Sequence, residues 1–204
     1  MADQIIPTRS ELMKLKKRIV LAKSGYNLLK KKRDGLILEF FEILKRAKTL
    51  RKELTEEYQQ ALGKVNIARV VEGDLKLKSL ALAVKNKPSL ELKSKNIMGV
   101  VVPKIIAQFK HGEFDRGYGI LSGSAVIDAS TVSFESLTQK VIQAAEVETA
   151  IKKLLNEIEK TKRRVNALEF EVIPRMHEQE KFILLRLQEM ERENIFRLKR
   201  IKKD

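Results

Sequence analysis

The side chains that could perform chemistry in this chain are few and far apart. It has two histidines, His111 and His177, and no cysteine. Glu178 and Glu180 lie close to His177 in sequence, and a histidine with two carboxylates is a set that can bind a metal ion. On a solvated helix, however, such residues are usually ordinary surface. Without cysteine there is no thiolate to act as a nucleophile or ligand. The residue types therefore predict neither a catalytic site nor a metal site.

The glycine patterns that bind phosphate groups are missing or incomplete. The chain has no Gly-x-x-x-x-Gly-Lys-Ser/Thr sequence, in which backbone N–H groups surround nucleotide phosphates. Gly117, Gly119 and Gly123 resemble a dinucleotide fingerprint, but the segment has one residue too many and no βαβ context. A glycine-rich turn explains this segment better. We therefore expect a non-catalytic chain without a cofactor.

Basic residues are concentrated near both ends of the sequence. Of the net charge of +15, residues 8–34 contribute +8 and residues 192–204 contribute +4. A basic excess of this size favours an acidic or polyanionic partner. The candidate contact residues are Arg9, Lys14, Lys17, Arg18, Lys31, Arg192, Arg197 and Arg200.

The nature of the acidic partner is less clear from charge alone. Aromatic residues make up only 5% of the chain and hardly mix with these charges, so base stacking has little support. A basic coiled-coil protein that binds nucleic acid or acts as a scaffold remains the alternative. Such a protein would co-purify with polymer and lose it steeply as salt rises.

The elements that position these charges are predicted by a long apolar stripe. Its spacing alternates between three and four residues without a break, and Arg33 is the only member that is not apolar. A period of 3.5 residues indicates helices wound around each other in a left-handed coiled coil. The stripe consists of Leu12, Leu15, Ile19, Ala22, Tyr26, Leu29, Arg33, Leu36, Phe40, Ile43, Ala47, Leu50 and Leu54. Thr8 and Glu11 are spaced as a capping box at its start.

The middle of the chain has a different pattern. Residues 97–103 are β-branched, residues 125–127 form a second short apolar run, and glycines lie between them. We expect two short strands that form a hairpin within a small lobe. The predicted division is a first coiled-coil helix at 1–62, the lobe at 63–132 and a second coiled-coil helix at 133–204.

The C-terminal helix is expected to return antiparallel along the first, which gives a mainly α fold. Pro174 removes one backbone hydrogen bond, and the stripe changes phase after it, so a kink or a shift of the seam is expected. Pairing Leu12 with Ile201 would bring Arg33 opposite Glu178 and Glu180, where an ion pair would fix the register. Alternatively, Arg33 extends past the seam into water.

Three segments of the chain together resemble a known family. The first comprises residues 7–18 (PTRSELMKLKKR) and 22–34 (AKSGYNLLKKKRD). The second is residues 96–103 (NIMGVVVP), and the third is residues 163–175 (RRVNALEFEVIPR). They resemble segments of the D subunit of the archaeal and vacuolar-type rotary ATPases, occur in that family's order and cover both long helices.

The resemblance implies a central rotor shaft that couples ATP hydrolysis or synthesis to the movement of H⁺ or Na⁺. Both chain ends would stand inside a ring of catalytic and non-catalytic A and B subunits. The lower part would bind the small F subunit of the stalk and the funnel-shaped C/d subunit on the membrane rotor ring. ATP would be bound and turned over by the ring and not by this chain, and nucleic acid is not expected. The resemblance further implies a peripheral membrane complex on the cytoplasmic side.

Overall fold

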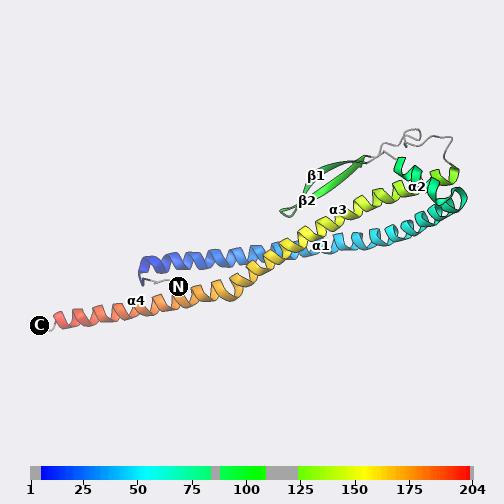
Figure 1. The fold of residues 1–204 in the computed structure, drawn as a ribbon. Coiled ribbons are helices and arrows are strands. Elements are labelled where there is room, and N and C mark those ends of the chain that lie inside the picture. The colour runs from blue at the N-terminus through cyan, green and yellow to red at the C-terminus, as the bar shows by residue number, and fades with distance from the viewer. Residues whose placement is uncertain (1–5, 84–87, 109–123, 203–204) are drawn as a thin grey trace. The chain divides into compact units, whose positions relative to one another are not determined.

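The computed structural model describes residues 6–83, 88–108 and 124–202 (Figure 1). The elements follow in the order α1 (Arg9–Glu72), α2 (Asp74–Ala83), β1 (Ser89–Ile97), β2 (Val100–Gln108), α3 (Ala125–Ala167), η2 (Leu168–Val172) and α4 (Ile173–Ile201). The fold is mainly α, with long N- and C-terminal helices and one small hairpin, as predicted.

Helix α1 begins where the capping signal places it. The Thr8 hydroxyl oxygen accepts the Glu11 backbone N–H at 3.2 Å, which satisfies one free donor of the first turn. The helix then runs to Glu72, beyond the expected end near residue 60, because neither Gly25 nor Gly63 breaks it. Gly73 ends it with a φ of +80°, a conformation that other residues adopt at a cost.

The apolar stripe lies on the packed face of α1. None of its thirteen positions is exposed, and Leu15, Ile19 and Leu36 are buried. The packed face continues past the predicted stripe with smaller residues, of which Ala61 and Ala68 are the most buried. The apolar stripe therefore predicted the packed face of α1 correctly, but the packed face extends beyond the last predicted position.

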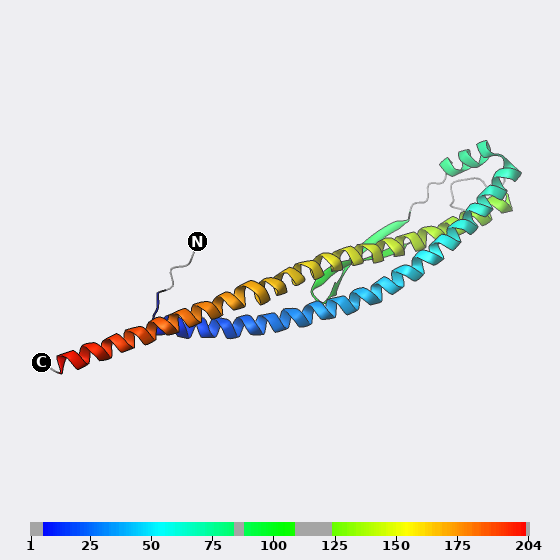
Figure 2. The ribbon, with the colours of Figure 1, turned by 90° about the horizontal axis from the view of Figure 1, so that it is seen from below.

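The chain divides into two compact units, each built from an antiparallel helix pair. We call Met1–Leu36 with Ile158–Asp204 the terminal unit, and Ile37–Glu157 the central unit. In the terminal unit, Arg9 pairs with Glu191 and Ile19 packs with Ile183. Residue numbers rise along α1 as they fall along α4, so the two helices are antiparallel, as expected (Figure 2).

The register of the terminal unit differs from the expected one. Leu15 and Ile19 form a buried cluster with Ile183, whereas pairing Leu12 with Ile201 would have placed residue 198 beside Leu15. Ile201 is 72% exposed. The expected pairing is therefore wrong, because apolar spacing fixes which face packs but not which turn meets which.

A π-helical turn precedes the proline and shifts the seam, as the phase change predicted. The Ile173 N–H bonds to the Leu168 carbonyl oxygen five residues back, and Pro174 stands in the first turn of α4. The positions turned toward the partner helix are Thr161, Val165, Leu168 and Val172 before the shift, and Met176, Glu180, Ile183 and Leu187 after it. The second set falls one residue later than seven-residue spacing requires. A π turn holds one extra residue, so it absorbs this difference and also spares the turn a clash with the proline ring.

The central unit pairs α1 with α3. Lys64 Nζ donates to the Ser133 hydroxyl oxygen at 2.6 Å, and Lys140 Nζ lies 2.6 Å from Glu57 Oε1. These two contacts show the antiparallel direction (Figures 1 and 2). Helix α3 begins at Ala125, earlier than the expected start near 133. Residues 125–127, expected as a strand, are helical, and the proposed division at 62 and 133 stays a prediction.

The predicted hairpin exists, but its strands are different ones. Strand β1 pairs antiparallel with β2, with Ile97 opposite Val100. Met98 and Gly99 form the two-residue turn with φ of 49° and 88°, and the Asn96 side-chain oxygen accepts the Gly99 N–H at 2.8 Å. Residues 97–103, expected as one strand, therefore contain this turn.

Strand β2 attaches the hairpin to α3. The Ile105 N–H donates to Glu146 Oε2 at 2.9 Å, and Lys153 Nζ donates to the Val101 carbonyl oxygen at 3.1 Å. The backbone groups of Val101 and Ile105 therefore point away from β1. Because every second residue of a strand turns its backbone groups to the same side, Pro103 has this orientation too. Its missing N–H therefore costs no bond between the strands, which explains why β2 continues through it.

Candidate interaction surface on the terminal unit

The structure offers no chemical centre around the histidine that it describes. His177 Nδ1 lies 3.2 Å from Glu180 Oε2 within one helix, and the histidine ring is partly exposed. Within residues 6–83, 88–108 and 124–202, no group of three or more acidic, histidine or cysteine side chains could hold a metal ion. His111 and the glycines at 112–123 lie outside the described residues.

All eight basic contact candidates are exposed, and the register places Arg192 level with the start of α1 while Arg197 and Arg200 lie beyond it. The pair between Arg9 and Glu191 joins the start of α1 to the last third of α4. Lys14 lies 3.3 Å from Glu11 and Arg197 lies 3.8 Å from Glu193, both in exposed pairs. In the part of the chain that the structure describes, the other candidates have no ion-pair partner, namely Lys17, Arg18, Lys31, Arg192 and Arg200.

The observed register gives this surface a feature that sequence reasoning missed. Because Glu191 lies level with Arg9, the last turns of α4 continue beyond the start of α1 (Figures 1 and 2). We call Arg192–Ile201 the overhang. Its large apolar side chains are 53–72% exposed, and they are Ile195, Phe196, Leu198 and Ile201. The expected register would have placed Leu198 and Ile201 on the covered seam, whereas the structure shows both as exposed.

The chemistry of the overhang suits recognition and not catalysis. Apolar and basic side chains alternate along it, and Lys199 and Arg200 stand in the last turn. Cations there complement the negative end of the helix dipole, so the helix can keep them without a carboxylate partner. The surface can therefore bind an acidic wall through charge and an adjoining apolar patch through contact area.

Arg33 does not support the predicted ion pair at the seam. It is half-buried, and its guanidinium bonds to Asp34 at 2.9 Å, while Glu180 lies beside His177. The hypothesis that Arg33 meets Glu178 or Glu180 rested on the Leu12–Ile201 register. That pairing stays a prediction, and the observed register argues against it.

Comparison with known proteins decides the family. The model of the family described as the ATP synthase D subunit matches residues 11–203, which is nearly the whole chain. The chain belongs to the ATP synthase D-subunit family. The resemblance noted in its two helical ends and its hairpin is thereby confirmed.

Relatives in this family match over nearly their full length. An A-type ATP synthase D subunit from Methanococcoides burtonii is 58% identical over 99% of this chain and 98% of its own length. Proteins of the same name from Methanosarcina acetivorans and Halorubrum lacusprofundi are 53% and 50% identical over 99% of this chain, and over 98% and 89% of their own lengths. No helix in the described ranges is long and apolar enough to cross a membrane.

Proposed function

We propose that this chain is the non-catalytic central-stalk component of an A/V-type ATP synthase or ATPase and acts as its rotor shaft. It would transmit rotation between the ring where ATP is hydrolysed or made and the part that moves H⁺ or Na⁺. The observation that supports this most is the antiparallel pairing of the two chain ends in the terminal unit, with an exposed cationic surface around it. Membership of the D-subunit family fits the same role.

Two paired helices suit a part that carries torque. Turning one helix against the other would disturb the buried packing of Leu15, Ile19 and Ile183, so a pair resists twisting more than a single helix does. The long basic side chains suit a part that meets several ring proteins in turn. Exposed ion pairs contribute only about 0.2–1 kcal/mol each, so contacts can break and re-form at each step.

The proposed partners follow from this arrangement. The basic surface and the overhang would face acidic residues of the A and B subunits in the ring. The central unit would contact the small F subunit of the stalk and the funnel-shaped C/d subunit. The complex would be peripheral, on the cytoplasmic side of the membrane, and ATP turnover would belong to the ring.

Rotation can be tested directly because the chain has no cysteine of its own. Lys95→Cys places a unique thiol on β1, an exposed strand, for attachment of a gold bead. With the assembled complex fixed to a surface through its ring, ATP should turn the bead in one direction in steps. The same preparation without ATP is the control. A bead that stays still while the complex hydrolyses ATP would overturn the proposal.

A further inference from the structure

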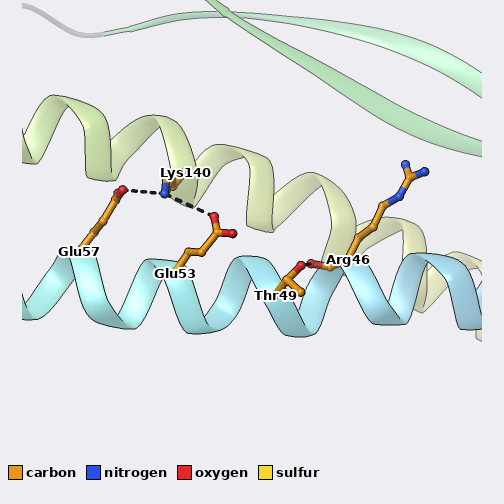
Figure 3. Close-up of polar contacts among 5 residues, drawn as sticks. All are labelled: Arg46, Thr49, Glu53, Glu57 and Lys140. Atoms are coloured by element: carbon orange, nitrogen blue, oxygen red, sulfur yellow. Dashed lines mark hydrogen bonds and ion pairs between the residues drawn. The ribbon is translucent and has the colours of Figure 1, made fainter.

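A lysine on α3 lies between two carboxylates of α1 in the central unit. Lys140 Nζ is 2.6 Å from Glu57 Oε1 and 3.4 Å from Glu53 Oε2, so one cation bridges two successive turns of the facing helix (Figure 3). The lysine side chain is 27% exposed and that of Glu57 is 32% exposed. The carboxylates hold the pKa of Lys140 above its ordinary value, chiefly through the hydrogen bond with Glu57.

The face that α1 offers near this contact is smooth. Its most buried residues in the central unit are Ala61 and Ala68, whereas α3 buries larger residues beside Ala150, namely Ile127, Leu137 and Leu154. Alanines leave room on α1, so a larger side chain of α3 can also be accommodated one heptad away. A slip by one heptad displaces the helices by only about 10 Å along their axes. Polar groups therefore add to the distinction between registers.

The residues one heptad away on α1 oppose a slip in either direction. Seven residues after Glu57 comes Lys64, which in the observed register bonds to Ser133, seven residues before Lys140. A slip one way would thus set Lys64 against Lys140.

A slip the other way meets a second cation. Arg46 lies seven residues before Glu53 on α1 (Figure 3). Its backbone carbonyl oxygen accepts a hydrogen bond from the Thr49 hydroxyl at 2.9 Å. This slip would set Arg46 and the apolar Leu50 against Lys140. Either slip therefore replaces attraction by like-charge repulsion, which is how charged positions specify pairing in helical coils.

We propose that Glu53, Glu57 and Lys140 form a register lock, in which Arg46 and Lys64 penalise the two neighbouring registers. The register lock determines the position of the hairpin as well as that of the two helices. The hairpin is bonded to α3 through Glu146 and Lys153, so the register of α3 on α1 also sets where the hairpin lies along α1. The lock acts within the central unit and does not depend on what the chain binds.

The register can be measured on the full chain with two spin labels. Lys45→Cys on α1 and Ser136→Cys on α3 are exposed and lie at different heights, so a slip changes their separation in a definite direction. Double electron–electron resonance should give one distance for the otherwise unchanged chain. Lys140→Glu repels Glu53 and Glu57 and attracts Lys64 or Arg46, so a second distance, displaced by about 10 Å, should appear.

Two further variants make the outcome decisive. Reversing all five charges together (Arg46→Glu, Glu53→Lys, Glu57→Lys, Lys64→Glu and Lys140→Glu) rebuilds the same pattern with opposite signs and should restore the single original distance. Lys152→Glu makes the same charge change at an exposed site on α3 and should leave the distance unchanged. If Lys140→Glu loses helix content, recovery in the five-residue variant supports the lock and failure to recover overturns it. One unchanged distance in Lys140→Glu would also overturn it.

Discussion

The terminal and central units use different side chains to solve the same problem of packing two antiparallel helices. The terminal unit buries large residues, such as Leu15, Ile19 and Ile183. The central unit buries alanines on α1 and larger residues on α3, such as Leu137 and Leu154, and it adds the charged contact between Lys140 and Glu57. Large apolar groups contribute free energy by leaving water, whereas charges contribute little net free energy but distinguish one pairing from another. The side chains that contribute stability and those that select the register are therefore different ones.

The largest effect is expected from removing a buried side chain of the terminal unit. Ile183 is 0% exposed, so Ile183→Ala should leave a cavity and lower the free energy of unfolding by about 2–5 kcal/mol. Ile195→Ala in the overhang is the matched control and should change it by less than about 0.5 kcal/mol. Urea unfolding followed by circular dichroism measures both. Equal effects of the two variants would mean that this seam does not carry the stability assigned to it.

The π turn allows a second test, which asks whether this turn keeps the apolar residues of α4 on the face that packs against α1. It holds one extra residue, so deleting Phe170 together with Pro174→Ala should leave a regular helix with Ile183 still on the seam. Inserting one alanine after Phe170 should instead rotate Ile183 off the seam and cost about 2–4 kcal/mol. Urea unfolding of both chains gives the comparison. A deletion that destabilises as much as the insertion would show that the turn does more than correct the phase.

Sequence reasoning predicted what depends on local spacing. The stripe from Leu12 to Leu54 gave the packed face of α1, Thr8 gave its start, and Pro174 marked the seam shift. Each of these is decided by neighbours within a few residues. The β-branched run at 97–103 predicted strand structure, but the turn at Met98 was missed because methionine rarely adopts positive φ.

What could not be predicted depends on contacts between distant residues. Apolar stripes on two helices fit equally well in several registers, so Leu12 opposite Ile201 was an arbitrary alignment. The overhang follows from the true register and was missed with it. The contact of Lys140 with Glu53 and Glu57 did leave a signal, since the two carboxylates stand four residues apart on α1, with Glu57 on the continued stripe and Glu53 next to Leu54. Reading it requires a known register, which only the structure supplies.

The surfaces of the two units should also differ in what they bind. Reversing Lys14, Lys17, Lys31 and Arg197 together to glutamate should weaken assembly with the ring proteins roughly 10- to 100-fold, because several weak ion pairs are lost at once. Reversing Lys48, Arg51, Lys52 and Lys152 is the control on the central unit, where all four are exposed. Co-purification and ATPase coupling of the reconstituted complex measure the effect. Unchanged assembly and coupling in the first variant would refute the assignment of the basic surface to the ring.

The smallest effect is confined to the corner where α1 meets α2 in the central unit. Hydrogen bonds from Lys76 and Lys78 hold the pKa values of Glu72 and Asp74 below the ordinary carboxyl range. A lowered pKa means that these pairs favour the folded corner above about pH 4 and that this contribution is lost as the pH falls further. Between about pH 6 and pH 2.5, the Cα chemical shifts of α2 should move toward coil values, while those around Ile183 stay helical because that residue is held by an apolar cluster.

The variant that separates this corner from general acid unfolding is Asp74→Asn. It removes one of the titrating groups together with its pair to Lys78, which is 2.7 Å long. The shifts of α2 in this variant should already lie nearer to coil values at pH 6 and should depend less on pH. If α2 in the unchanged chain instead stays helical down to pH 2.5, the ion pairs do not hold the corner. The backbone conformation of Gly73, together with the hydrogen bond from the Leu77 N–H to the Gly73 carbonyl oxygen, would then be sufficient to form the corner.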